Sequence, residues 1–325
     1  MDKKFWKNKK VLITGHEGFL GSWLSGTLID AGAHVVGVDI VKNRKISLLN
    51  ENGLRNRFIG VKADIADFKS MRRIIKKYNP QVIFHLAAEA IVARANKEPV
   101  RTFKSNIEGT WNILEIARQT KAIEAIVMAS SDKAYGSHKI LPYTEAAALK
   151  GDHPYDVSKS CADLIGYTYA HTYEVPVATT RCGNIYGPGD YNFSRIVPDA
   201  ICCALSGRKL IIRSDGKFTR DYIYAADIVD GYIMLAENLR KLKLQGQAFN
   251  LSDENPITVI ELVNKIYSLS GQKSKYKILN KARYEIKHQY LDSSKARRLL
   301  KWKPKYSLDR GLKAAMEWYA NHVVA

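Results

Sequence analysis

The stretch SSDKAYG, residues 130–136, places a carboxylic acid and an amine side by side at Asp132 and Lys133. It continues directly from the apolar run EAIVMAS (124–130), which predicts a buried strand. Ligands of open α/β sheets bind at the carboxyl ends of strands, so this pair is a candidate for acid–base chemistry. The alternative interpretation is a solvated turn.

A second candidate pair lies in PYDVSKSCADL, where Tyr155 and Lys159 are four residues apart. This spacing predicts that both side chains share one face of a helix. A lysine ammonium one turn away can lower the pKa of the phenol, so Tyr155 could accept a proton from an alcohol as a hydride leaves the same carbon. The Y-x-x-x-K spacing is common in helices, and it becomes specific only together with the other motifs.

The strongest of these motifs is VLITGHEGFLGSWL, whose glycines follow a predicted strand and open a predicted helix: Gly15, Gly18 and Gly21. Glycines here permit a tight turn and the close approach of backbone N–H groups to a pyrophosphate. Asp39 closes the next predicted strand, where a carboxylate can accept both ribose hydroxyls and repel a 2′-phosphate. The pattern favours NAD, while Lys42 and Arg44 leave NADP open.

Two further strand ends contribute to the predicted dinucleotide site. Asp64 follows the third strand and suits either an adenine amino group or the N-cap of the next helix. Ala87 and Ala88 end the fourth strand with small side chains that let a cofactor lie against the backbone. His85 is interpreted as a packing residue.

Short apolar runs alternate with helical patterns through the first half of the chain. The predicted strands are 10–14, 34–39, 57–64, 81–87, 124–130 and 176–181. This βα rhythm predicts an α/β fold with a doubly wound parallel sheet covered on both faces. Residues 1–181 are expected to form the dinucleotide-binding domain, joined by a strand near 248–251, and 182–325 mainly a smaller substrate-binding lobe.

The composition of the chain argues against several classes of function. The chain has 325 residues, 46% of them apolar, and a formal net charge of +19. The lysines are spread along the chain without an RNP, C₂H₂ or basic-zipper pattern, so we expect a solvated basic surface and no nucleic-acid partner. Four cysteines without C-x-x-C spacing predict reduced core thiols and no metal site. The absence of an apolar leader or a long apolar run predicts a cytoplasmic protein without membrane contact.

Together these motifs resemble the extended short-chain dehydrogenase/reductases that act on nucleotide-diphosphate sugars. The resemblance covers essentially the whole chain and is closest to the CDP-glucose 4,6-dehydratases, especially in FWKNKKVLITGHEGFLGSWL and SSDKAYG. It implies a Rossmann fold and a homodimer that pairs the helices around 100–119 and 155–173 into a four-helix bundle. Departures in GNIYGPGD and RDYIYAADIV, which resemble epimerases and dTDP-glucose dehydratases, leave the nucleotide base and the sugar open.

The resemblance also implies a role for each candidate residue. Ser131 and Tyr155 would handle the C4 hydroxyl while NAD accepts the C4 hydride, Lys133 would remove the C5 proton, and Asp132 would protonate the departing C6 hydroxyl. Lys159 and the nicotinamide charge would depress the pKa of Lys133. The implied cofactor contacts are Gly15, Gly18, Phe19, Leu20, Gly21, Asp39, Asp64, Ile65, Ala87, Ala88, Tyr155 and Lys159. The implied sugar and diphosphate contacts are Asn184, Tyr186, Arg195 and Arg220, with a surface ion pair as the alternative for Arg195.

Two other functions stay open on the sequence alone. A nucleotide-sugar 4-epimerase would use Ser131, Tyr155, Lys159 and NAD without needing Asp132 or Lys133. A non-catalytic dinucleotide sensor or nucleic-acid-binding protein would suit the positive charge. The Tyr155–Lys159 pair argues against that third class, because a sensor needs no proton-transfer tyrosine.

Overall fold

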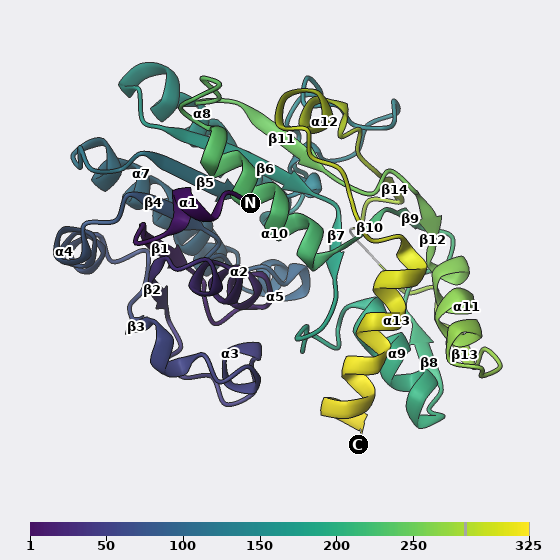
Figure 1. Ribbon diagram of the computed structural model, residues 1–325. Coiled ribbons are helices and arrows are strands. Elements are labelled where there is room, and N and C mark those ends of the chain that lie inside the picture. Colours follow the sequence, from purple (N-terminus) through teal and green to yellow (C-terminus); the bar gives the residue numbers. More distant parts are fainter. Residues whose placement is uncertain (283–284, 325) are drawn as a thin grey trace.

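The computed structural model describes residues 1–282 and 285–324. Within these residues a seven-stranded parallel sheet runs in the order β11-β6-β5-β4-β1-β2-β3 (Figure 1). Its strands are β1 (Lys10–Thr14), β2 (His34–Asp39), β3 (Ile59–Lys62), β4 (Val82–His85), β5 (Ala125–Ala129), β6 (Val177–Cys182) and β11 (Ala248–Leu251). Because the order reverses at β1, the sheet is doubly wound. The predicted fold class is confirmed.

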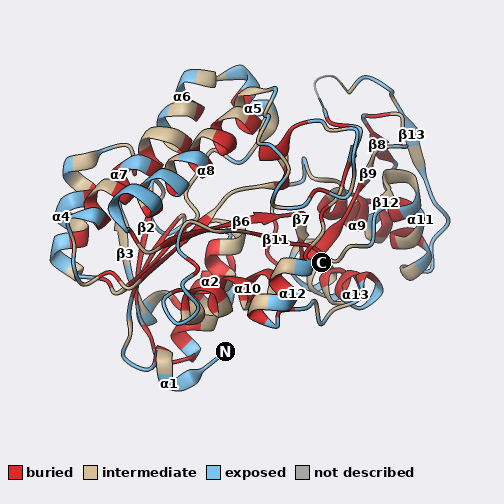
Figure 2. Ribbon diagram, turned by 90° about the horizontal axis from the view of Figure 1, so that it is seen from above, coloured by how far each residue is buried: buried red, intermediate tan, exposed pale blue. Residues whose placement is uncertain are grey.

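Helices cover both faces of the sheet (Figure 2). One face packs against α2 (Phe19–Asp30) and α10 (Ala225–Asn238), and the other against α4 (Phe68–Tyr78), α7 (Gly109–Arg118) and α8 (Pro154–Tyr173). Successive residues of a strand point to opposite faces, which the central strand β1 illustrates. Its Val11 and Ile13 belong to the α2/α10 core, whereas Leu12 belongs to the α4/α7/α8 core. Burial on both sides explains why the strands are almost entirely apolar.

A smaller lobe lies beside the carboxyl ends of the strands, with a second apolar core of its own. Its strands are β7 (Asn184–Tyr186), β8 (Leu210–Ile212), β9 (Thr219–Arg220), β10 (Tyr222–Tyr224), β12 (Ile257–Thr258), β13 (Tyr276–Ile278) and β14 (His288–Gln289). Its helices are α9 (Ile196–Ser206), α11 (Val259–Leu269) and α13 (Leu308–Tyr319). The chain returns from this lobe to the main core through α10 and β11, so the domain boundary at residue 181 stays a prediction.

The remaining helical segments are short. They are α1 (Lys3–Trp6), α3 (Leu48–Glu51), α5 (Val92–Lys97), α6 (Pro99–Phe103), α12 (Ser294–Leu300), the 3₁₀ turns η1 (Arg55–Arg57) and η3 (Asp132–Tyr135), and the π turns η2 (Lys104–Glu108) and η4 (Ala320–Val324). In the described part of the chain, no helix combines the length and the apolarity needed to span a membrane. All four cysteines are free thiols, and three of them are buried.

Candidate functional site

A cavity of about 1180 Å³ lies where the strand ends meet the smaller lobe. Five consecutive strand ends contribute to its wall, through Gly15, Asp39, Asp64, Ala87 and Ser131. Parallel strands end at one edge of the sheet, so residues distant in sequence converge there. The residues predicted for cofactor binding and catalysis all line this cavity: Gly15, Gly18, Phe19, Leu20, Gly21, Asp39, Asp64, Ile65, Ala87, Ala88, Ser131, Asp132, Lys133, Tyr155 and Lys159.

The glycine-rich turn is shaped for close approach of a ligand to the backbone. Gly15 has φ +76°, and a Cβ atom there would lie 2.8 Å from the backbone nitrogen of Ala87. A Cβ atom on Gly21 would lie 2.1 Å from the carbonyl oxygen of Gly15. Helix α2 begins at Phe19 with Gly18 as its N-cap, so its first N–H groups lie at the cavity wall. Glycines without room for side chains, next to a helix N-terminus, fit a pyrophosphate.

Two carboxylates lie at the other strand ends of this region. Asp39 is held by backbone N–H groups, with Oδ2 accepting from Glu17 (3.2 Å) and Oδ1 from Val41 (3.1 Å). Asp64 lines the cavity, and its Oδ1 accepts from the N–H of Ala66 (2.9 Å). The alternative of Asp64 as a helix N-cap is wrong, because Asp67 caps α4 by accepting from the N–H of Ser70. The carboxylate of Asp39 and the glycine turn together fit the adenosine half of NAD.

Ser131 and Asp132 form a compact unit after β5. Ser131 is the N-cap of η3, and its Oγ accepts from the N–H of Lys133 (3.2 Å) and donates to Oδ1 of Asp132 (2.9 Å). Asp132 is 4% exposed, and its Oδ2 has no hydrogen-bond partner among the described residues. Burial raises the pKa of Asp132 against the opposing pull of Lys133 and the Ser131 hydrogen bond. Asp132 is therefore suited to be a neutral acid.

Lys133 is the basic half of the pair. Burial lowers its pKa, and the nearby Arg220 guanidinium lowers it further, against the attraction of Asp132 and Asp156. The largest contribution of a protein cation to this lowering of the pKa comes from Arg220, where the sequence suggested Lys159 and the nicotinamide charge. Arg220 lies on β9 of the smaller lobe, so a charge from a distant segment adds to the effect of burial on Lys133.

Tyr155 and Lys159 lie in the first turns of α8, which begins at Pro154. Burial raises the pKa of Tyr155, and a hydrogen bond with Ser131 opposes that rise. Nζ of Lys159 donates to the carbonyl oxygen of Ala129 (2.8 Å), and burial lowers its pKa to about 8. The positive charge of Arg195 also opposes this rise in the pKa of Tyr155, whereas Lys159, which the sequence suggested for this role, is bound to the Ala129 carbonyl.

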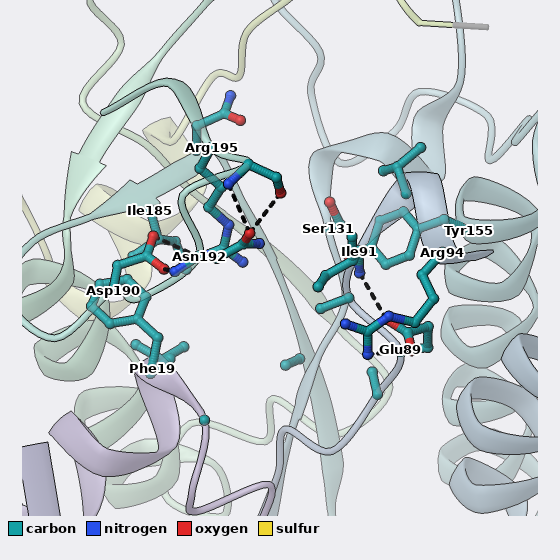
Figure 3. A pocket seen from close by; sticks show the side chains of 18 of the residues that line it. Phe19, Glu89, Ile91, Arg94, Ser131, Tyr155, Ile185, Asp190, Asn192 and Arg195 are labelled. Carbon is teal, nitrogen blue, oxygen red and sulfur yellow. Dashed lines mark hydrogen bonds and ion pairs between the residues drawn. The ribbon is translucent and has the colours of Figure 1, made fainter. Parts of the chain in front are cut away.

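The smaller lobe supplies the opposite wall of the cavity. Figure 3 shows Arg195 and Asp190 across from Ser131 and Tyr155, and Nη1 of Arg195 donates to Oδ2 of Asp190 (2.9 Å). This ion pair is the alternative that the sequence left open for Arg195, which also lines the cavity. Asn184 is a further lining residue.

Arg220 and Tyr186 differ in their relation to the cavity. Arg220 lines it, and its Nη1 donates to the carbonyl oxygens of Thr219 (2.8 Å) and Lys287 (3.0 Å), which fix the guanidinium. Tyr186 is not among the lining residues. Its side chain is buried in the second core, and its hydroxyl donates to the carbonyl oxygen of Leu308 (3.2 Å). The structure makes Tyr186 a packing residue, because it follows β7 into the interior of the smaller lobe.

Several further charged residues line the cavity that the sequence did not predict, among them Glu89, Arg94 and Asp156. Glu89 and Arg94 form an ion pair (3.3 Å) close to Tyr155 (Figure 3). Asp156 follows Tyr155 directly, and burial raises its pKa to about 6. The position of Asp156 beside Tyr155 was a usable sequence signal. Glu89 follows β4 and Arg94 lies on α5, and they carry no recognisable catalytic spacing.

Comparison with known proteins places the chain in a family. The sequence model of the GDP-mannose 4,6-dehydratase family matches residues 12–315. The chain is 32% identical to CDP-glucose 4,6-dehydratase of Salmonella typhimurium, over 98% of this chain and 92% of that protein.

Comparison with solved structures gives the same family assignment. UDP-glucose 4-epimerase of Thermotoga maritima, crystallised with UDP-glucose, has 29% identity and a TM-score of 0.86, covering 96% of this chain and 98% of that one. The NAD complex of dTDP-glucose 4,6-dehydratase from Bacillus anthracis has 27% identity and a TM-score of 0.86, covering 97% of both chains. The chain belongs to the GDP-mannose 4,6-dehydratase family, among the NAD-dependent nucleotide-sugar dehydratases and epimerases of the extended short-chain dehydrogenase/reductases.

Proposed function

We propose that the protein is an NAD-dependent nucleotide-sugar 4,6-dehydratase of the CDP-glucose 4,6-dehydratase type. The observation that carries the proposal is the acid–base pair beside Ser131 in the cavity, in which Asp132 is buried and Lys133 is half-buried. Removing water from a sugar needs one group that takes a proton from C5 and another that gives a proton to the C6 hydroxyl. The raised pKa of Asp132 and the lowered pKa of Lys133 suit these two tasks.

NAD, when bound, supplies the acceptor for the C4 hydride, returns that hydride to C6, and brings a positive charge close to the phenol. Tyr155, hydrogen-bonded to Ser131, takes the proton of the C4 hydroxyl. The resulting C4 ketone acidifies the C5 proton, which passes to the neutral amine of Lys133. Asp132 protonates the departing C6 hydroxyl, and one water leaves. C5 then regains a proton, so the net reaction is the loss of water without net oxidation.

The charged residues of the cavity support a nucleotide-diphosphate sugar as substrate. Arg195 and Arg220 lie in its wall on the smaller lobe. The planar guanidinium of Arg195 can match diphosphate oxygens in paired hydrogen bonds, and Arg220, held by backbone carbonyl oxygens, adds positive charge that attracts the diphosphate. Asn184 lies with them. In this proposal Arg195 exchanges its contact with Asp190 for the ligand.

A 4-epimerase is the second candidate, favoured by the similarity to the Thermotoga maritima enzyme over nearly the whole chain. An epimerase would use Ser131, Tyr155 and Lys159 but would leave the acid–base pair Asp132–Lys133 without a role. We therefore rank it below the dehydratase.

The deciding experiment is mass spectrometry of products after the protein is incubated with NAD⁺ and CDP-, dTDP-, UDP- and GDP-hexoses in turn. The dehydratase is expected to convert one of them to a product about 18 Da lighter, without accumulation of NADH, since the hydride is returned. A product of unchanged mass and altered stereochemistry would establish the epimerase instead. The same panel identifies the nucleotide base.

The proposal includes a homodimer formed through α7 and α8, which lie side by side. Their outer faces expose large apolar side chains, with Trp111 43%, Leu164 55% and Tyr167 53% exposed. Apolar surface gathered on adjacent helices favours association. The absence of a nucleic-acid partner and the cytoplasmic location stay predictions.

A further inference from the structure

A buried ion pair ties the glycine-rich turn to the segment that follows β2. The side chain of Glu17 is 1% exposed, and its carboxylate accepts hydrogen bonds from Nη1 (2.5 Å) and Nη2 (2.9 Å) of Arg55. The same carboxylate accepts from the backbone N–H groups of Asn43 (2.9 Å) and Arg44 (3.3 Å). Four donors thus converge on one carboxylate in the wall of the cavity.

All three nitrogens of the Arg55 guanidinium donate hydrogen bonds in this arrangement. Besides Glu17, its Nη2 donates to Oγ of Ser47 (3.0 Å) and to the carbonyl oxygen of Arg44 (3.0 Å), and its Nε donates to Oδ1 of Asn50 (2.6 Å). Its paired donors are those that would otherwise match a phosphate. Burial raises the pKa of Glu17, but the hydrogen bonds from Arg55 and the attraction of His16 outweigh it and lower the pKa, so the carboxylate stays ionised.

This network lies next to the carboxylate that the proposed function assigns to the ribose of NAD. The N–H of Glu17 donates to Oδ2 of Asp39 (3.2 Å), and Asp39, Arg44 and Ser47 line the same part of the cavity. Lys42, Arg44 and Arg55 make this segment cationic, a composition that suits the 2′-phosphate of NADP. Two of its backbone N–H groups and the guanidinium of Arg55 are nevertheless committed to Glu17.

We infer that Glu17 is a specificity-determining residue for the cofactor. By binding Arg55 and the backbone N–H groups of Asn43 and Arg44, it makes these donors unavailable to a 2′-phosphate. The site then selects the dinucleotide with a free 2′-hydroxyl. This inference rests on the proposed dependence on NAD, and it adds a second carboxylate to the selection that Asp39 exerts.

The test compares the dissociation constants of NAD⁺ and NADP⁺, measured by titration calorimetry on the full-length protein and its variants without a sugar substrate. Glu17→Gln frees Arg55 and removes one negative charge, so the ratio Kd(NADP⁺)/Kd(NAD⁺) is expected to fall by about tenfold or more. Arg55→Gln leaves Glu17 charged and unpaired, so the ratio is expected to rise. In the double variant Glu17→Gln/Arg55→Gln, the gain in NADP⁺ affinity should disappear.

Glu17→Gln and Arg55→Gln are expected to change the ratio Kd(NADP⁺)/Kd(NAD⁺) in opposite directions. This distinguishes a role of Glu17 in cofactor selection from a merely structural role. If Glu17 only holds the segment in place, all three variants weaken NAD⁺ and NADP⁺ alike, and a constant ratio overturns the inference. Should Glu17→Gln fail to fold, the direction of the Arg55→Gln change decides. A wild-type protein that binds both dinucleotides equally also overturns the inference.

The matched control is Glu51→Gln. Glu51 lies on α3 in the same segment, and its carboxylate accepts from the hydroxyl of Tyr191 and from Nε1 of Trp318 instead of facing the dinucleotide site. The ratio Kd(NADP⁺)/Kd(NAD⁺) of the Glu51→Gln variant should stay at the wild-type value. If the ratios shift as expected but no sugar is dehydrated, the inference stands and the proposed function fails. The two are therefore tested separately.

Discussion

Asp132 and Lys133 are neighbours in sequence whose surroundings move their pKa values toward each other. Burial raises the pKa of the carboxyl and lowers that of the amine, and Arg220 adds to the second effect. The neutral forms of both groups are stabilised in the same low-dielectric cavity. Both shifts favour the proton-donating form of Asp132 and the proton-accepting form of Lys133.

This arrangement predicts different partial reactions for two variants. In Asp132→Asn the base is retained, so the C5 hydrogen of the sugar should still exchange with solvent deuterium while the loss of water falls by about 10²-fold or more. Lys133→Met should abolish both exchange and dehydration. Exchange at C5 and loss of water are both measured by mass spectrometry of sugars incubated with the protein in D₂O. Equal C5 exchange in Lys133→Met and wild type would contradict the role of Lys133 as base.

For Tyr155, the prediction concerns the first proton transfer. Tyr155→Phe keeps the ring that packs in the first turn of α8 but removes the hydroxyl, so kcat should fall by about 10²- to 10⁴-fold. The dissociation constant of NAD⁺ should change little, because Lys159 and the glycine turn remain. Steady-state kinetics and titration calorimetry check the two parts. A variant with more than about a tenth of wild-type kcat would show that another group accepts the proton.

The sequence predicted those catalytic residues that belong to short local motifs. Ser131, Asp132 and Tyr155 were found because each belongs to a short pattern at a strand end or helix start. The effect of Arg220 on the pKa of Lys133 was not predicted, because the two residues are far apart in the chain. Tyr186 was assigned to the substrate for its place in a motif, whereas the packing of β7 turns it into the second core.

Among the elements, α8 connects catalysis to stability. It carries Tyr155 and Lys159 on its cavity side, and it also places Asp156, which is 3% exposed, next to Lys133 and Asp132. A buried carboxyl raised from 3.8 to a pKa of about 6 binds its proton more tightly in the folded state than in the unfolded state. The folded state therefore loses relative stability as the pH rises from about 4 to 6.

Asp156→Asn removes this ionisation, so its effect depends on pH. Relative to wild type, the variant should gain stability as the pH rises from about 4 to 6, with a pH-dependent gain of up to about 3 kcal/mol above pH 6. Urea unfolding of both proteins across that interval measures the difference. A stability difference that is constant with pH would show that Asp156 is ionised in the folded protein throughout.

The elements themselves were predicted better than the site. All six strands expected in the first half are present, because short runs of apolar residues identify the strands of a parallel sheet, including the edge strand β3, which is not buried. The helix expected near 105–120 is interrupted by the π turn η2 and continues from α6, which apolar periodicity does not reveal. The small strand pairs of the second lobe were missed, since strands of two or three residues leave no pattern.

For the molecule as a whole, assembly is the property to test. Leu164→Lys on α8 places a charge on the exposed apolar face formed with α7 and should shift the protein from dimer to monomer in sedimentation velocity experiments. Its control, Lys69→Glu on α4, lies on another helix and should leave the sedimentation coefficient unchanged. A wild-type protein that sediments as a monomer at micromolar concentration would contradict the homodimer.

The edge strand β11 has a consequence for how the molecule is made. It pairs with β6 only after the whole segment from β7 to α10 has been synthesised, so β6 leaves the ribosome with one edge unpaired. A strand with an open edge is a template for aggregation, and long-range parallel pairing forms slowly. The nascent protein should therefore depend on chaperones until residue 251 has emerged. A fragment ending at residue 181 should accumulate in inclusion bodies.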